Sequence, residues 1–418
     1  MRDTSNKIVV IGGGAAGMMA AITAAEQGAP VILLERNEKL GRKLNITGKG
    51  RCNLTNNCSA QEALAQVPRN SRFLFSAFSR FDSRAAMDFF ERYGLALKTE
   101  RGNRVFPVSD SAFDVTDTLR AALHKHHAAI VHDRARQLLL DDAGAVCGVE
   151  GERGSYAARC VILATGGVSY PATGSTGDGY TMAQAVGHTI LPPQPSLISL
   201  VCEDACCGRM QGLSLRNVAL SVKNQKKKTV YEDFGEMLFT DRGVSGPMIL
   251  SASAHLRDYQ KNLYRLVIDL KPALTEEKLE ERILRDLAEQ HNRDFGNLLS
   301  GLIPRSMIPV IIERTGIPSN TKANSVTRQQ RRRLIDVMKH FSLTVTGPGP
   351  IEQAIITSGG VKTGEINPTT MESKKVPGLY FAGEIIDVDA YTGGFNLQIA
   401  WATGHAAGMA AAEAEKEG

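Results

Sequence analysis

The chain has 418 residues, of which 43% are hydrophobic and 22% charged, so it holds enough apolar sequence for two or three domain cores and is neither disordered nor fibrous. Its 49 Lys and Arg against 44 Asp and Glu make it mildly basic, which permits an anionic ligand and falls short of a dedicated nucleic-acid binder. Because no apolar run approaches the ~18 residues of a membrane span, we expect a soluble cytoplasmic protein without a membrane partner.

The seven cysteines and nine histidines do not indicate a metal or disulfide site. The cysteines are scattered along the chain, and no Cys-x-x-Cys occurs. His124, His126 and His127 have no carboxylate or cysteine at ligand spacing, so we interpret them as the polar end of a helix. We therefore expect reduced thiols and no bound metal.

The first segment predicts a strand, a tight turn and a helix. Residues 7–11 form a β-branched apolar run, glycines follow, and an alanine-rich stretch of helical character continues to Gln27. A second apolar run at residues 30–35 is typical of a parallel strand that is buried on both faces. Together these segments predict one βαβ unit.

A Gly-x-Gly-x-x-Gly pattern formed by Gly12, Gly14 and Gly17 lies at the predicted turn. In such a turn the first glycine permits the sharp bend, the second lets a pyrophosphate approach the backbone, and the third lets the helix pack on the strand. Glu35 ends the next strand, where a carboxylate accepts hydrogen bonds from an adenosine ribose and repels a 2′-phosphate. The pattern predicts FAD or NAD rather than NADP.

Later segments favour FAD. Residues 159–167 and 378–383 are predicted as further buried strands, so both ends of the chain supply strands to the sheet. Gly393 and Gly394 then open a helix in the alanine-rich tail, whose N-terminus would favour negative charge on a flavin. The alternative for these two glycines is a plain turn before the helix.

Between these strands, residues 191–347 have a different character. Residues 196–222 alternate like antiparallel strands, whereas residues 275–299 and 303–341 have helical spacing. This change of pattern predicts a domain inserted into the dinucleotide-binding fold.

Several ordered motifs resemble those of the YhiN/BaiN-type flavoproteins, over residues 7 to about 410. The matching segments are residues 11–18, Gly41-Arg-Lys43, residues 47–55, Phe239-Thr240 with residues 245–247, residues 357–361, residues 370–372 and Gly383-Glu384. The resemblance implies an α/β, Rossmann-like fold of the two-dinucleotide-binding-domain type that binds FAD, with an inserted β-rich domain and a small helical domain. We expect the FAD-binding domain at residues 1–190 and 357–418, the β-rich domain at 191–272 and 342–356, and the helical domain at 273–341.

The resemblance implies cofactor contacts from the glycine turn, the acidic strand end, a basic loop, the segments that contain Ala135 and Thr165, and the end of the chain. They are Gly12, Gly14, Ala15, Ala16, Gly17, Glu35, Arg36, Arg42, Lys43, Gly48, Arg51, Asn53, Ala135, Thr165, Gly166, Gly383, Glu384, Asn396 and Leu397. The cations of this loop should cover a pyrophosphate and flavin, although a solvated basic loop is the alternative. Ala135 stands where related proteins often have Val against adenine.

The resemblance implies three chemistries. They are reduction of a carbon–carbon double bond conjugated to a ketone in bile-acid intermediates, oxidation of a small amine such as aminoacetone, and reduction of a uridine in ribosomal RNA. We favour the first, with NADH as a transient electron donor and a flat apolar molecule as substrate. Residues 197–201 and 237–250 could line its cleft or simply pack in a core. Tyr391, directly before the last helix, is the candidate proton donor, although it could merely pack the loop.

The alternatives rest on other residues. An RNA substrate would use residues 226–228 and 328–333 as phosphate contacts, although such charge runs are usually solvated faces. A non-enzymatic flavin redox sensor would use the vicinal Cys206 and Cys207. Asp241-Arg242 stands where several relatives have His, so a role for that His as acid or base does not transfer.

Overall fold

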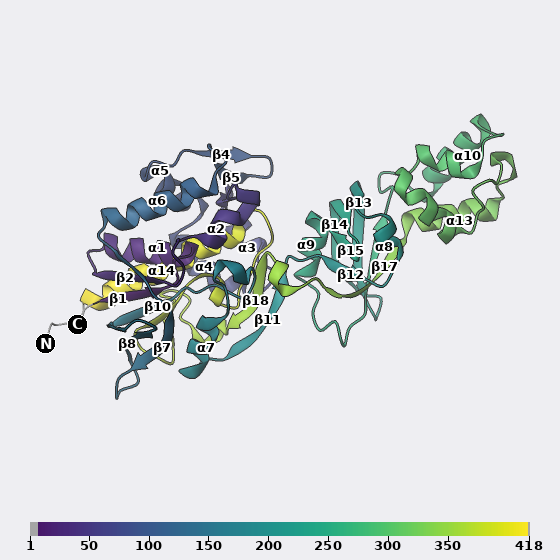
Figure 1. Ribbon diagram of the computed structural model, residues 1–418. Coiled ribbons are helices and arrows are strands. Elements are labelled where there is room, and N and C mark those ends of the chain that lie inside the picture. Colours follow the sequence, from purple (N-terminus) through teal and green to yellow (C-terminus); the bar gives the residue numbers. More distant parts are fainter. Residues whose placement is uncertain (1–6, 417–418) are drawn as a thin grey trace. The chain divides into compact units, whose positions relative to one another are not determined.

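A computed structural model describes residues 7–416 and shows two units, each with its own hydrophobic core (Figure 1). The first unit reaches to Ser196 and resumes at Pro350, and the second comprises Leu197–Gly349. Residues 190–196 stay with the first unit because they form a strand, β11 (Ile190–Ser196), that pairs with β18 (Ile356–Val361). No helix in the described part of the chain is long and apolar enough to cross a membrane.

A parallel five-stranded sheet is the centre of the first unit. Its strands, in spatial order, are β19 (Leu379–Phe381), β10 (Cys160–Leu163), β1 (Ile8–Ile11), β2 (Val31–Glu35) and β6 (Ala129–His132). The strands β1, β10 and β19 are continuously apolar because parallel strands with cover on both faces have no solvated side, whereas the edge strand β6 is partly exposed. In β1, for example, every residue is buried. The predicted α/β fold, with strands from both ends of the chain, is confirmed.

Two alanine-rich helices pack side by side on this sheet (Figure 1). They are α1 (Ala15–Glu26), which follows β1, and α14 (Phe395–Lys416), which ends the chain. A Cβ on Gly404 would lie 2.5 Å from the carbonyl oxygen of Ala16, and a Cβ on Gly408 would lie 2.4 Å from that of Ala20. Glycine at these positions therefore permits the close approach of the middle of α14 to the first turns of α1.

The first unit also contains two small antiparallel sheets and several short helices. Its remaining elements are α2 (Arg42–Ile46), β3 (Thr55–Asn56), α3 (Ala60–Ala65), α4 (Phe75–Arg80), α5 (Ser83–Arg92), β4 (Leu97–Glu100), β5 (Arg104–Pro107), α6 (Ala112–Lys125), β7 (Ala135–Leu140), β8 (Val146–Gly151), β9 (Ser155–Ala157) and α7 (Asp178–Ala185). Helix α6 ends at Lys125, so His124 lies in its last turn and His126 and His127 follow the helix end.

The second unit is built on a closed antiparallel barrel. Its strands, in spatial order, are β12 (Leu200–Cys202), β15 (Gly243–Ser245), β14 (Thr229–Phe239), β13 (Ser214–Asn224), β16 (Tyr264–Asp269) and β17 (Phe341–Pro348). Side chains on these strands alternate between the core and solvent, as in β16, where Tyr264, Leu266 and Ile268 are buried.

Helices make up the rest of the second unit. They are α8 (Cys206–Arg209), α9 (Pro247–Ser253), α10 (Glu276–Glu289), α11 (Phe295–Leu298), α12 (Ile308–Thr315) and α13 (Arg328–Lys339). Helix α13 begins with a capping box in which Thr327 and Gln330 bond each other's backbone N–H. The expected run of alternating strand over residues 196–222 differs in detail, because α8 interrupts it between β12 and β13.

Candidate functional site

The turn between β1 and α1 contains three glycines with different roles. A Cβ on Gly12, whose φ is +107°, would lie 2.5 Å from the Ala164 carbonyl oxygen, and a Cβ on Gly17 would lie 1.8 Å from the Gly12 carbonyl oxygen. The packing of the chain itself therefore requires these two glycines. Gly14 differs, because a Cβ there would meet no atom of the described chain within 4 Å, and its φ of −85° suits any residue. The absence of a side chain at Gly14 keeps the backbone accessible from outside.

The helix that follows this turn begins with free backbone donors. Gly14 is the N-cap of α1, no side chain caps the helix, and its first turn contains no acidic residue. The first N–H groups of such a helix need an external acceptor, and the helix dipole favours an anion. The start of α1 thus has the chemistry of a phosphate-binding site.

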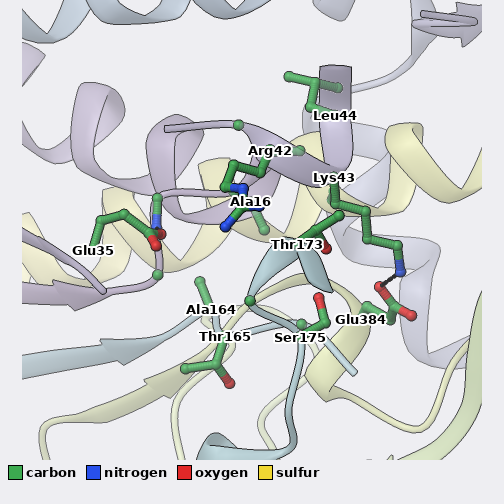
Figure 2. Close-up of a pocket in the computed structure, with 18 of the residues that line it drawn as sticks. Ala16, Glu35, Arg42, Lys43, Leu44, Ala164, Thr165, Thr173, Ser175 and Glu384 are labelled. Carbon is green, nitrogen blue, oxygen red and sulfur yellow. Dashed lines mark hydrogen bonds and ion pairs between the residues drawn. The ribbon is translucent and has the colours of Figure 1, made fainter. Parts of the chain in front are cut away.

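A pocket opens over this helix start, at the carboxyl ends of β1, β2, β10 and β19 (Figure 2). Ligands of open parallel sheets bind at this edge. The predicted residues that line the pocket are Gly12, Gly14, Ala15, Ala16, Glu35, Arg36, Arg42, Lys43, Ala135, Thr165, Gly166, Glu384, Asn396 and Leu397. Most of the predicted cofactor contacts therefore come together around one cavity.

Glu35 is buried at the end of β2 and braces the glycine turn. Its Oε2 accepts a hydrogen bond from the Gly13 N–H at 2.7 Å, and its Oε1 accepts from the Asn37 backbone and side chain at 2.7 and 2.6 Å. A carboxylate offers about four acceptor positions, so one remains for a ligand hydroxyl. Glu35 can therefore bind a ribose while it shapes the turn.

On the side of the pocket opposite Glu35, an ion pair joins two of the pocket walls. Lys43 Nζ donates to Glu384 Oε2 at 2.6 Å (Figure 2). It also donates to the Ser169 hydroxyl at 2.6 Å. Glu384 Oε1 accepts from the Thr357 N–H at 2.8 Å and from the Ser169 hydroxyl at 3.0 Å. The Lys43 and Glu384 side chains are only 22% and 12% exposed, so this network fixes two walls of the pocket that come from opposite ends of the chain.

Six predicted residues do not belong to this lining. Gly17 and Gly383 serve packing, since a Cβ on Gly383 would lie 2.7 Å from the Ala16 Cβ. Arg51 lies over the Phe106 ring and pairs with Glu100 and Asp110. The others are Gly48, Asn53 and Tyr391. Arg51 is thus an ion-pair partner within the protein, and its predicted role toward the cofactor stays a prediction.

Neighbouring residues fix the backbone conformation of Gly393 and Gly394, which precede α14. Gly393 and Gly394 have φ of +128° and +98°, and a Cβ on Gly394 would lie 2.4 Å from the Thr55 backbone. With its amide oriented by hydrogen bonding, Asn53 accepts from the Gly394 N–H at 3.0 Å. Asn56 Nδ2 donates to the Gly393 carbonyl at 3.0 Å. The contacts of Gly393 and Gly394 therefore fix the turn before α14, and the role of this helix start toward a flavin stays a prediction.

The loop in front of this diglycine contains Tyr391. Its backbone N–H donates to the Gln66 carbonyl at 3.0 Å, and its side chain is half-buried. Asn396, which lines the pocket, holds the same loop by exchanging two hydrogen bonds with the Ala390 backbone at 2.8 and 2.7 Å. The loop is thus fixed at both ends, next to the pocket.

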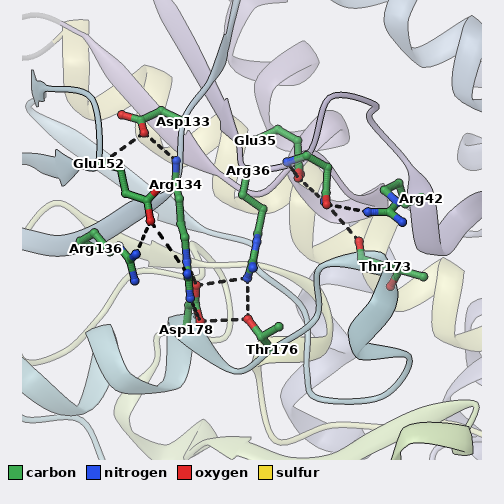
Figure 3. Close-up of polar contacts among 11 residues, drawn as sticks. Glu35, Arg36, Arg42, Asp133, Arg134, Arg136, Glu152, Thr173, Thr176 and Asp178 are labelled. Atoms are coloured by element: carbon green, nitrogen blue, oxygen red, sulfur yellow. Dashed lines mark hydrogen bonds and ion pairs between the residues drawn. The ribbon is translucent and has the colours of Figure 1, made fainter.

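Sequence reasoning missed part of one end of the pocket. Asn37, Asp133, Arg134, Thr173, Ser175 and Asp178 also line the cavity. Asp178, at the start of α7, accepts hydrogen bonds from both Arg134 and Arg36 (Figure 3). No motif marked these residues, because they meet only when separate segments fold together.

The vicinal cysteines Cys206 and Cys207 lie in the hydrophobic core of the second unit. A hydrogen bond with Cys207 and burial raise the pKa of the Cys206 thiol, and a hydrogen bond with Cys202 contributes most to raising that of Cys207 to about 12. Thiolates are thereby disfavoured, which argues against a redox sensor at this pair. Within residues 237–250, Met237 and Met248 belong to the core of the second unit.

A parallel sheet with an uncapped helix start and an acidic strand end defines a Rossmann-type dinucleotide-binding protein. The chain belongs to the HI0933-like family, because the family model described as the HI0933-like protein Rossmann domain matches residues 6–410. The resemblance inferred from the motifs is thereby confirmed.

Two curated proteins are similar over nearly their whole length. The 3-dehydro-bile acid delta(4,6)-reductase of Clostridium scindens is 34% identical over 413 residues, which are 98% of this chain and 99% of that protein. The ribosomal RNA dihydrouridine synthase of Escherichia coli is 30% identical over 399 residues, which are 94% of this chain and 95% of that protein.

The fold is also shared with solved structures. One is the 3-ketosteroid-delta4-(5alpha)-dehydrogenase from Rhodococcus jostii RHA1, with a TM-score of 0.52, 17% identity, and coverage of 98% of this chain and 97% of that one. At this identity the likeness shows the fold alone.

Proposed function

We propose that this protein is an FAD-dependent oxidoreductase that reduces a carbon–carbon double bond conjugated to a carbonyl group, with a 3-oxo-4,6-diene of the bile-acid type as the leading substrate. The observation that carries the proposal is the uncapped start of α1 beside Gly14, together with the Glu35 carboxylate at the end of β2. This pair suits the pyrophosphate and ribose of an adenine dinucleotide.

The described residues fit FAD along the length of the pocket. The N–H groups at the start of α1 and the cations Arg42 and Lys43 would hold the pyrophosphate, and Glu35 would hold the adenosine ribose. Glu384 would hold the ribityl chain, and the start of α14 would lie near the flavin ring. When bound, FAD supplies reversible hydride transfer, so the protein has to place the substrate and provide a proton.

We infer the reaction class from the names of the two relatives, because both names describe the same type of reaction. The reductase of Clostridium scindens is named for the double bonds of a 3-dehydro-bile acid, and the Escherichia coli protein is named for dihydrouridine. In each case a hydride and a proton are added across a double bond conjugated to a carbonyl group. We give the bile-acid type preference because its relative is the more similar of the two over almost the full chain.

The chain's own residues would then have two tasks. The Lys43–Glu384 pair and the Asn396–Ala390 clamp hold the walls next to which the substrate reacts. Tyr391 would donate the proton that the enolate requires after hydride addition. NADH would be oxidised to NAD⁺ in the same cycle, so the substrate gains two hydrogen atoms in total.

An anaerobic experiment tests this function. The purified protein is reduced with NADH, and its reoxidation is followed separately with a 3-oxo-4,6-diene steroid, with aminoacetone and with oxygen. We expect fast reoxidation by the dienone alone. Fast reoxidation by oxygen, with aminoacetone consumed in turnover, would favour the amine oxidase alternative, and reduction without turnover of any acceptor would favour a redox sensor.

A second candidate is reduction of a uridine in ribosomal RNA, and the charge distribution favours it. Residues 197–349 contain 23 Lys and Arg against 17 Asp and Glu, whereas the rest of the chain contains 26 against 27. Lys226, Lys227 and Lys228 are exposed at the turn between β13 and β14. On α13, Arg332 and Arg333 are exposed, as on any solvated amphipathic helix, whereas Arg331 is partly buried and donates to the Val326 carbonyl at 3.0 Å.

Charge reversal at this turn separates the two candidates. A variant with Lys226, Lys227 and Lys228 changed to Glu should keep its rate with a small dienone, because the turn lies in the second unit. With an RNA substrate the same variant should bind less tightly and with a salt slope that is lower by ~0.9 for each lost duplex contact. Loss of ribosomal RNA reduction in this variant would place the RNA candidate first.

A further inference from the structure

Two residues at the end of β2 should have opposite effects on the binding of a phosphorylated ribose. Glu35 is the acid that accepts a ribose hydroxyl and repels a 2′-phosphate. Arg36 follows it directly, and an arginine near this position is what accommodates the 2′-phosphate of NADP in related folds. Arg134, from the segment between β6 and β7, adds a second guanidinium to the same lining. Two cations beside Glu35 would make this end of the pocket attractive to a phosphorylated ribose.

The structure pairs both cations with one carboxylate. Asp178 accepts two hydrogen bonds from Arg134, from Nε at 2.7 Å and from Nη2 at 3.0 Å, and one from Arg36 Nη1 at 3.3 Å (Figure 3). Thr176 completes the arrangement, since its hydroxyl donates to Asp178 at 2.9 Å and accepts from Arg36 Nη1 at 2.6 Å. The bidentate contact fixes the plane of the Arg134 guanidinium, and planar contacts of this kind are the strong and specific ones.

The position of Asp178 makes this pairing stable. It is the first residue of α7, where the helix dipole favours a carboxylate. The hydrogen bond from Arg134 lowers the pKa of Asp178, so the carboxylate stays ionised and both guanidinium groups keep their partner. The side chains of Asp178, Arg36 and Arg134 are 27%, 31% and 29% exposed, which leaves the group partly shielded from water and salt.

We propose that Asp178 is the residue that makes this pocket select an unphosphorylated adenosine ribose. It holds both Arg36 and Arg134 in hydrogen-bonded ion pairs, so neither guanidinium would be free to bind a 2′-phosphate. NADP(H) has the same ADP core as FAD and NAD, so exclusion of the 2′-phosphate keeps it from competing for the site. This inference rests on the proposed dinucleotide function of the pocket.

A binding experiment with a matched pair of nucleotides tests the proposal. The full-length protein, stripped of bound nucleotide, is titrated calorimetrically with ADP-ribose and with 2′-phospho-ADP-ribose, which differ only in the phosphate. The wild type should bind ADP-ribose more tightly by at least about tenfold. Asp178→Asn, which removes the charge and keeps the size, should shift the ratio of the two affinities toward the 2′-phosphate by at least about tenfold.

Two further variants control the test. The first is Glu152→Gln, which changes a residue of the same cluster. Glu152 pairs with Arg136 and lies 3.9 Å from Arg134, but it does not line the pocket. The ratio of the affinities of this variant for ADP-ribose and 2′-phospho-ADP-ribose should equal that of the wild type. Arg134→Gln should move the ratio the other way, further against the 2′-phosphate, because Asp178 then keeps only Arg36. This variant decides the question even if Asp178→Asn fails to fold.

The outcomes separate this inference from the function it rests on. An unchanged ratio in Asp178→Asn or Arg134→Gln, with ADP-ribose still bound, would overturn the inference alone. Equal affinity of the wild type for both nucleotides would also overturn it. A wild-type protein that binds neither nucleotide would overturn the proposed dinucleotide function together with the inference.

Discussion

Lys43 Nζ lies 2.6 Å from Glu384 Oε2, which joins two residues 341 positions apart in the chain. Lys43 belongs to α2, in the N-terminal part of the first unit, and Glu384 follows β19 near the C-terminal end. The pair is largely buried, and Glu384 also accepts from Ser169 and Thr357. This ion pair thus helps to hold two walls of the pocket together before any ligand binds.

Removal of either partner of this pair should therefore destabilise the protein. Lys43→Met leaves a shielded carboxylate without its cation, and Glu384→Gln weakens acceptance from Ser169 and Thr357, so each should lower the free energy of unfolding by ~1–3 kcal/mol. The double variant should lose less than the sum of the two. Urea unfolding measures these values. As a control, Arg84→Gln, from the exposed Arg84–Asp88 pair, should change the free energy by less than ~0.5 kcal/mol.

Substitutions at two positions of the glycine turn should have different effects, one on flavin binding and the other on stability. Gly14→Val should give a folded protein without flavin, because a Cβ there would meet no protein atom within 4 Å, and the side chain would occupy the place of the pyrophosphate. Gly17→Val should lower thermal stability, because its Cβ would lie 1.8 Å from the Gly12 carbonyl oxygen. Flavin content and thermal unfolding of both variants check this. Full flavin content in Gly14→Val would show that the turn does not hold the phosphates.

Acid stability should depend on Glu365. Burial by itself would raise the pKa of this carboxyl, but hydrogen bonds from Lys375 and Thr189 outweigh burial and lower it from 4.5 to about 2. The ionised form is therefore preferred in the folded state, so its contribution to stability is complete above pH ~4.5 and is lost as pH falls toward 2. Glu365→Gln should be less stable than wild type at pH 7 and should lose less stability in that acid range. Unfolding curves at several pH values measure both effects, and parallel pH profiles would contradict this account.

Tyr391 should matter for the acceptor reaction only. If its hydroxyl supplies the proton after hydride addition, Tyr391→Phe should slow reoxidation of the reduced protein by a dienone ~10²–10⁴-fold. Flavin content and reduction by NADH should stay at the wild-type level, because the backbone contact of Tyr391 with Gln66 does not need the hydroxyl. Stopped-flow absorbance measures both half-reactions. Unchanged dienone kinetics would remove Tyr391 from the mechanism.

The sequence predicted those features of the site that have a local signature. Gly12, Gly14 and Gly17 mark a turn between adjacent elements, and Glu35 follows from the end of the next strand, so short-range pattern suffices for both. Asp178 was missed because its meaning depends on Arg36, 142 positions away, and on Arg134. Pairing of this kind exists only in the folded chain.

The same reasoning explains where expectation and structure differ. Arg51 is one of four cations in a short loop, and composition cannot tell which of them faces the pocket; the fold turns Arg51 toward Glu100 and Asp110. The barrel of the second unit was predicted only as a β-rich insertion, because closure depends on pairing between β12 and β17, which are far apart in the chain. Alternation showed the strands but not the short helix α8 between them.

The identity of the bound cofactor tests the central claim most directly. The bound chromophore of the purified protein is released by acid precipitation and identified by mass and fluorescence, and its affinity is compared between wild type and Glu35→Ala. The account predicts non-covalent FAD, one per chain, bound about ten- to a hundredfold more weakly by the variant because a charge-assisted hydrogen bond to the ribose is lost. FMN, or no flavin after reconstitution with FAD, would contradict it.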